Sequence, residues 1–251
     1  KFVFNGAAAQ SVTFVHPNTS DSYFKDITID NASTAGVTFA SDVYVTGQLT
    51  LGAAGKLTQT ASFETYYSGS PPAIASGTYA VANTYVSNLV LGADLVWLFD
   101  LVVAPPRSLA LNGHTLTVNG DFTVLNTTGS SSHLIMTNPV DVLTVNGNAT
   151  FGGRNNLSAG TINIKGNLIQ QNNADAIRPT GTKFAFNGAA AQSVTFVHPE
   201  TFDSYFKDVT IDNASAAGVT FASNVYVTGQ LTLGAAAKLT QTASFETYYS
   251  G

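Results

Sequence analysis

A long internal repeat constrains this chain more than any other feature. Residues 1–69 return as residues 183–251 at a constant offset in the numbering, so the fold must accept the same sequence twice. We predict one full tandem unit over residues 1–182 and the start of the next over 183–251; a self-contained protein with duplicated ends is the alternative. Seven positions differ: Val3/Ala185, Asn18/Glu200, Ser20/Phe202, Ile27/Val209, Thr34/Ala216, Asp42/Asn224 and Gly55/Ala237.

A shorter pattern recurs inside the unit. It consists of an apolar-x-apolar triplet, a turn residue with glycine, and another such triplet. Such short alternating runs, rich in β-branched residues and bounded by Gly and Asn, predict β-strands. No helical periodicity lasts beyond one turn, so we expect no significant helix. The instances are "FVFNG" (2–6), "VYVTGQLTL" (43–51), "LALNGHTLTV" (109–118), "LTVNGDFTV" (116–124), "LTVNGNATF" (143–151), "INIKGNLIQ" (162–170) and "FAFNG" (184–188).

The segment "LTVNGDFTV" admits two interpretations. Taken alone, Asn-Gly between alternating apolar residues is a strong hairpin signal. However, strands of three or four residues form poor antiparallel ladders. The spacing of the turn glycines at 120, 147, 166 and 188 fits coils of about 18–27 residues that stack on one another. We therefore predict an all-β, right-handed parallel β-solenoid (β-helix), in which Asn-Gly marks a corner between two strands.

The corners have an expected chemistry. Gly and Asn adopt left-handed backbone conformations at the least cost, and stacked Asn amides can bond from coil to coil. Seven to ten coils per unit, about 4.8 Å apart, would give a rise of about 33–48 Å. The predicted corner residues are Asn5, Gly6, Gly47, Asn119, Gly120, Asn146, Gly147, Gly166, Asn187, Gly188 and Gly229.

The runs "LTVNGDFTV", "LTVNGNATF" and "AGTINIKGNLIQ" resemble repeats of large bacterial surface and secreted proteins with right-handed parallel β-helices, including filamentous haemagglutinin-like adhesins. The resemblance covers residues 109–170 and both copies of the segment 37–59. It implies an exported, elongated protein with an adhesive or scaffolding role. The near-identical long unit departs from that family and favours a repetitive fibre.

The composition limits the classes of partner and binding site that we expect for this chain. Charged residues make up 10% of the chain, the net charge is −5, and no basic run exists, so nucleic acid is not an expected partner. The absence of cysteine excludes disulfides and thiolate metal sites. One apolar stretch, Leu89–Ala104, contains Asp94 and Asp100 and is shorter than the roughly 20 residues of a membrane helix. We interpret it as buried strands and expect no membrane span in this segment.

The sequence carries no recognisable catalytic motif. The densest acids are Asp21, Asp26 and Asp30, repeated at 203, 208 and 212, and alternation would place Asp26 and Asp30 on one face. We interpret them as surface acids and turn caps. The histidines are His16, His114, His133 and His198, and none has the spacing of a metal ligand. We therefore expect no catalytic, cofactor-binding or metal-binding residue, and no enzyme activity.

These features lead to a structural hypothesis. The chain is expected to be a segment of a long extracellular or cell-surface fibre: a filament, sheath or adhesin stalk. Its partners would be further copies of the repeat, in tandem or end to end, with surface glycans as a second class. The alternative is a carbohydrate-binding or polysaccharide-degrading β-helix, in which the pairs Tyr66-Tyr67 and Tyr248-Tyr249 could stack on sugars. A third hypothesis, an ice or mineral binder, requires a flat threonine-rich face.

Overall fold

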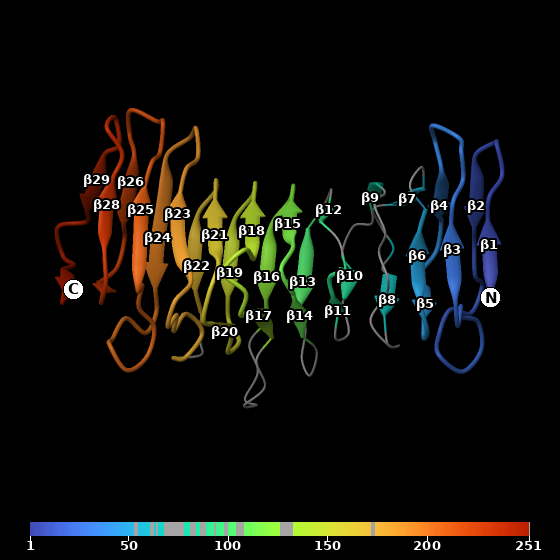
Figure 1. Cartoon of the computed structure of the whole chain (residues 1–251), viewed down its shortest axis with the longest axis horizontal. Coiled ribbons are helices and arrows are strands. Elements are labelled where there is room, and N and C mark those ends of the chain that lie inside the picture. The colour runs from blue at the N-terminus through green and yellow to red at the C-terminus, as the bar shows by residue number, and fades with distance from the viewer. Residues whose placement is uncertain are drawn as a thin grey trace.

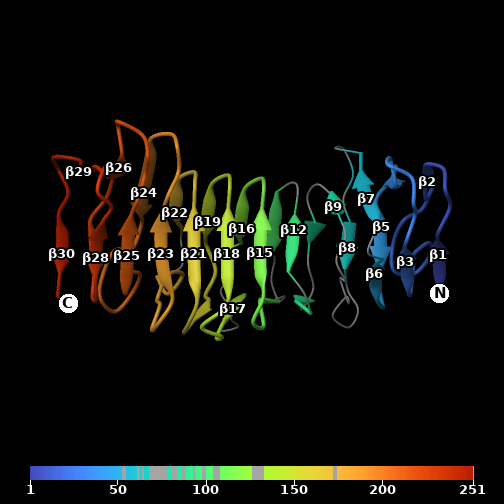
Figure 2. The same ribbon diagram turned by 45° about the horizontal axis from the view of Figure 1, so that its top comes forward.

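The chain forms a parallel β-solenoid in this computed structural model. Short strands lie side by side along one long axis, and the two termini lie at opposite ends of the stack (Figures 1 and 2). No helix occurs within the described part of the chain. The structure describes residues 1–52, 55–60, 63, 65–67, 78–80, 84–85, 89–92, 94–97, 100–103, 108–125, 133–171 and 174–250.

Each turn of the solenoid visits three faces in a fixed order. Face 1 is a sheet of eleven described strands: β2 (Gln10–Val12), β4 (Val37–Phe39), β7 (Lys56–Gln59), β9 (Thr78–Ala80), β12 (Leu95–Trp97), β15 (Thr115–Val118), β18 (Val142–Val145), β21 (Thr161–Ile164), β23 (Lys183–Phe186), β25 (Asp208–Ile211) and β28 (Leu231–Leu233). Face 2 has ten: β5 (Val43–Val45), β8 (Thr65–Tyr67), β10 (Thr84–Tyr85), β13 (Leu101–Val103), β16 (Phe122–Val124), β19 (Ala149–Phe151), β22 (Leu168–Gln170), β24 (Gln192–Phe196), β26 (Val219–Phe221) and β29 (Leu239–Gln241).

Face 3 is divided into three shorter sheets, whose strands precede those of face 1 along the chain. The first comprises β1 (Phe2–Phe4), β3 (Ile27–Ile29) and β6 (Leu49–Leu51). The second comprises β11 (Leu89–Val90), β14 (Leu109–Ala110), β17 (Leu134–Met136) and β20 (Asn156–Leu157). The third comprises β27 (Val225–Val227) and β30 (Thr247–Tyr249).

The alternating triplets produce the core. In most strands the two apolar residues are buried and the residue between them faces outward, as in β16 and β19. Parallel pairing then stacks like on like, so that Leu116 lies between Leu95 and Leu143. Burying each such side chain contributes about 1.5–3 kcal/mol relative to leaving it exposed. The interior is therefore a continuous apolar column, and polar chemistry is concentrated on the outward positions, corners and loops.

The hairpin interpretation of "LTVNGDFTV" is wrong, and the parallel solenoid is confirmed. Val118 pairs with Trp97 and Val145, in the turns before and after it, and Phe122 on face 2 pairs with Leu101 and Ala149. Hence Asn119-Gly120 joins strands of two different sheets.

The turns of the solenoid differ in length. Paired residues are closest in sequence where Thr84 pairs with Leu101, and they are much further apart where Leu116 pairs with Leu143. The extra residues of a long turn lie in the loops and corners, because the strands themselves stay short.

The apolar stretch that begins at Leu89 contains β11, β12 and β13. Leu89, Leu95 and Trp97 are buried, which agrees with the interpretation as core strands. No helix long and apolar enough to cross a membrane occurs in the described residues.

The corner glycines, all in the described part of the chain, do not adopt the left-handed backbone conformation expected of them. All the predicted corner residues lie between strands of different sheets, but positive φ occurs elsewhere among the described residues, at Gly36, Asn112, Gly113, Gly160 and Gly218. Five of the corner glycines, Gly47, Gly147, Gly166, Gly188 and Gly229, are instead required by close backbone approach between turns, whereas Gly6 faces only the side chains of Gln10 and Asn31. A Cβ on Gly166 would lie 2.4 Å from the carbonyl oxygen of Gly147, and one on Gly188 would lie 2.3 Å from that of Lys165.

Candidate functional site

A ladder of acceptor side chains runs along the corner between faces 1 and 2. Each side-chain oxygen accepts the backbone N–H of a residue one turn further on. Asp100 accepts from Asp121 at 2.7 Å, and Asp121 accepts from Asn148 at 2.7 Å. Asn148 then accepts from Asn167 at 2.9 Å, and Asn167 from Ser193 at 2.8 Å. These Asp and Asn side chains thus hold successive turns together.

The predicted bonding between stacked asparagines also occurs. Asn146 Nδ2 donates to Asn119 Oδ1 at 2.7 Å, both at corners, whereas the corner residue Asn187 places Nδ2 3.5 Å from Oδ1 of Asn163, an outward residue of β21. Asparagine at these corners therefore contributes coil-to-coil hydrogen bonds as well as a turn.

The repeated acids are separated by the fold. Asp26 precedes β3 and Asp30 follows it, so the two carboxylates lie at opposite ends of one strand, both on its outward side, as the alternation with the buried Ile27 and Ile29 shows. Asp26 accepts the Gln48 N–H at 2.9 Å, and its copy Asp208 accepts the Gln230 N–H at 2.7 Å. Both act as caps on the following turn. Within the described residues, no group of three or more acids and histidines could hold a metal ion.

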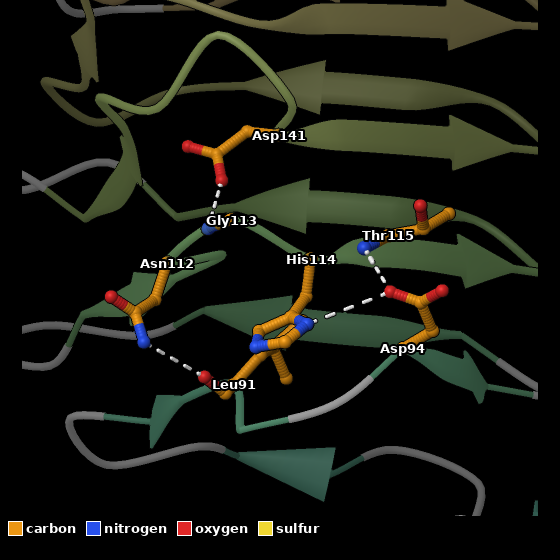
Figure 3. A network of polar contacts seen from close by, with 7 residues as sticks. All are labelled: Leu91, Asp94, Asn112, Gly113, His114, Thr115 and Asp141. Atoms are coloured by element: carbon orange, nitrogen blue, oxygen red, sulfur yellow. Dashed lines mark hydrogen bonds and ion pairs between the residues drawn. The ribbon is translucent and has the colours of Figure 1, made fainter.

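A polar network ties one corner of the middle turns together (Figure 3). Asn112, in a left-handed conformation with φ of 54°, donates from Nδ2 to the Leu91 carbonyl at 3.2 Å. Asp94 accepts the Thr115 N–H at 2.8 Å and lies 3.7 Å from His114 Nδ1. His114 therefore belongs to a turn that is fixed by backbone hydrogen bonds.

Asp141 is the buried carboxylate of this network. It is fully buried, and it accepts the N–H of Gly113 at 2.6 Å and those of Thr137 and Asn138 at 2.9 Å each. Three backbone donors engage the two oxygens, so this carboxylate caps two turns. Sequence reasoning did not single out Asp141, although its position at the start of an alternating run is a signal for a cap.

The other predicted histidines lie apart from one another. His133 is buried directly before β17, and its imidazole lies over Gly153, where an added Cβ would be 2.6 Å from Cδ2. His16 is exposed and its copy His198 is half-buried, each in the loop after a face 1 or face 2 strand.

Outward tyrosines form two stacked pairs, which we call the tyrosine columns. Tyr44 and Tyr66 stack with ring centroids 4.5 Å apart and an interplanar angle of 15°. Their copies Tyr226 and Tyr248 stack at 4.4 Å and 12°. Stacking covers one face of each ring and leaves its edges, its hydroxyl group and its other face outside the pair. Tyr248 donates to Glu246 at 2.5 Å, and this hydrogen bond raises the pKa of the Tyr248 hydroxyl to about 12.

The second members of the two tyrosine pairs differ in what the structure describes. Tyr248 lies on the outward side of β30 beside Tyr226, whereas Tyr249 is in register with the buried Val227 on the inward side. Both rings are exposed, at 39% and 57%, because β30 is the last strand of its sheet. The side chain of Tyr67 lies outside the described residues.

Threonines form ladders of limited length. Thr38 and Thr58 hydroxyls lie 2.8 Å apart, and those of Thr220 and Thr240 2.9 Å apart. On face 1 the column of outward residues contains Thr144, then Asn163 and Ala185, and only then threonine again. A flat threonine array of the kind that ice binding requires is therefore interrupted on this face.

Comparisons with protein-family models, with curated proteins and with solved structures gave no match for this chain.

Proposed function

We propose that this chain is a structural segment of a long extracellular fibre built from tandem copies of the unit 1–182. The observation that carries the proposal is the join between the first unit and the second. Strand β23, the first of the second unit, pairs with β21 over four residues, from Thr161↔Lys183 to Ile164↔Phe186. On face 2, β24 pairs with β22 in the same parallel manner. One unit thus continues the sheets of the preceding unit without a break.

The buried side chain of Gln192 links the two units at this join. Gln192 Nε2 donates to the carbonyls of Ile164 at 2.9 Å and Gly166 at 2.6 Å, both in the first unit. Its Oε1 accepts from the Gly188 N–H at 3.0 Å and from Asn213 Nδ2 at 2.7 Å, both in the second. All of these residues belong to the repeated sequence or to the segment that precedes it in every unit, so each join of a tandem array could form the same contacts.

The extracellular location is supported by composition. Few charges, no cysteine and a surface of Thr, Asn and Ser suit an exported scaffold, and a solenoid whose turns contact only their neighbours extends without limit. Such a fibre would serve as filament, sheath or adhesin stalk.

Concatemers of one, two and three units provide the test. Each added unit should lengthen the particle by about 40 Å in electron micrographs, since turns stack about 4.8 Å apart. Compact particles whose length does not grow with unit number would overturn the fibre. Antibodies against the unit should label intact cells of the source organism, and labelling only after permeabilisation would overturn the extracellular location.

Carbohydrate binding is a second candidate, favoured by the outward position of the tyrosine columns. Each stacked pair offers hydroxyl groups and outer ring faces, so a glycan would be bound by hydrogen bonds together with ring stacking. A glycan array probed with the chain, and with the double variant Tyr44→Ala/Tyr226→Ala that breaks both tyrosine columns, would distinguish this function. Specific glycans bound by the chain and lost in the variant would support it.

A further inference from the structure

The two copies of the repeated sequence occupy different faces of the solenoid. Strand β2 lies in face 1, whereas its copy β24 lies in face 2. Strand β1 lies in face 3, and its copy β23 in face 1. Strand β5 lies in face 2, and its copy β27 in face 3. Every copied strand is therefore displaced by one face, in the direction in which the chain advances.

The number of turns in one unit follows from the sheet order. Along face 1, β23 is the eighth described strand after β2, and β24 comes next along the chain on face 2. Along face 2, β26 is the eighth after β5, and β27 comes next on face 3. The counts along both sheets therefore give a unit of eight turns plus one face. This length lies within the seven to ten turns expected from the sequence.

Contacts on face 3 confirm that part of the second copy lies on this face. Tyr205 N donates to the Ile177 carbonyl at 2.8 Å, and the isolated bridge between Phe206 and Val227 continues this face into β27. In the first copy, the equivalent bridge joins Phe24 to Val45 on face 2.

Local structure is preserved despite the displacement. Phe24 contacts Phe2, Phe4 and Phe14 with ring centroids 5.1, 6.0 and 5.1 Å apart. Its copy Phe206 contacts the copies of those three rings at 5.0, 5.9 and 5.1 Å. The repeated sequence therefore fixes its own packing, and the preceding turns determine only the face on which it begins.

We propose that a tandem array of these units is a screw in which each unit advances by about 40 Å and turns by one face, about a third of a turn. The tyrosine columns would then appear on the three faces in succession and return to the same face only after three units. Such a fibre would present one recognition surface in three directions, which suits multivalent contacts with several neighbours. The proposal rests on the tandem continuation proposed above.

Spin labels in the existing chain test the displacement directly. The chain has no cysteine, so paired cysteine substitutions give unique labels. Thr117 and Thr210 face outward in one column of face 1, four turns apart, whereas Thr123 faces outward on face 2. The pair T117C/T210C should show a distance distribution centred near 20 Å, from four turns of about 4.8 Å each. The control pair T123C/T210C should be longer. Without the displacement Thr210 would lie on face 3, and a T117C/T210C distance as long as the control would overturn the proposal.

The array itself is tested by cryo-electron microscopy of a concatemer with four units. The expected symmetry is a rise of about 40 Å with a rotation near 120° per unit. A rotation near zero would overturn the screw while leaving the fibre intact. A compact particle would overturn the fibre, whereas the spin-label distances would still report the displacement within the single chain.

Discussion

Gln192 and Asn213 form the same hydrogen bond as their copies Gln10 and Asn31, at 2.7 Å in both places, buried in the second copy and partly buried in the first. In the second copy, however, Gln192 also donates to two carbonyls of the preceding unit. The Gln–Asn pair therefore stabilises the local structure of each copy. In the second copy it also links one unit to the preceding one.

Replacing Gln192 should weaken the chain more than replacing Gln10. Gln192→Ala removes four hydrogen bonds from a buried side chain, although the Ile164 carbonyl keeps the Asn187 N–H and Asn213 Nδ2 keeps the Ala190 carbonyl. Groups left unsatisfied by such a change cost about 1–3 kcal/mol each. We expect the free energy of unfolding to fall by about 2 kcal/mol or more. Gln10→Ala is the matched control, with a smaller loss. Urea unfolding followed by circular dichroism measures both, and equal losses would contradict a special role for the join.

Corner glycines should be intolerant of a methyl group wherever two turns touch. At Gly166 an added Cβ would meet three backbone atoms of Gly147 and Asn148 within 2.9 Å. Because backbone cannot move aside cheaply, Gly166→Ala should destabilise the fold by about 1–3 kcal/mol. Gly92→Ala is the control, since nothing lies within 4 Å of its Cβ position. Thermal unfolding compares the two variants, and similar melting temperatures would show that close approach does not require glycine.

The strands and their stacking could be predicted from the sequence because buried and outward residues alternate so regularly, as in β15 and β18. The corners could be located from Asn-Gly and Thr-Gly, but their physical reason could not. Close approach depends on the residue one turn away, as for Gly166 above Gly147, and local sequence does not reveal it. The displacement of the second copy by one face could not be predicted from the sequence either. The turns differ in length, and weak, very short strands such as β10 and β20 must be counted to find it.

The aromatic cluster around Phe206 should be a principal source of stability in the second unit. Phe206 is fully buried and contacts Phe184, Phe186 and Phe196. Truncating such a ring removes apolar contacts and leaves a cavity, so Phe206→Ala should cost about 3–5 kcal/mol. Phe202→Ser is the matched control, because Phe202 is 77% exposed and the first copy carries Ser20 at that position. Its effect should stay within about 0.5 kcal/mol. A large loss of unfolding free energy in Phe202→Ser, with a small loss in Phe206→Ala, would contradict this role of Phe206 in the core.

Tyr248 provides a pH-dependent test of the second tyrosine column. Its hydrogen bond to Glu246 favours the neutral phenol and raises its pKa to about 12. Since the folded pKa is raised, the contact contributes fully below about pH 10, the pKa of an unperturbed tyrosine, and is lost as the pH rises through about 12. Replacing Glu246 by glutamine removes the negative charge, so the pKa of Tyr248 should fall towards its ordinary value. Site-resolved NMR titration of the tyrosine ring carbons measures the shift, with Tyr205 as an internal reference on the same face. A pKa that stays near 12 in Glu246→Gln would show that desolvation and the neighbouring Tyr226, rather than the charge of Glu246, hold the phenol neutral.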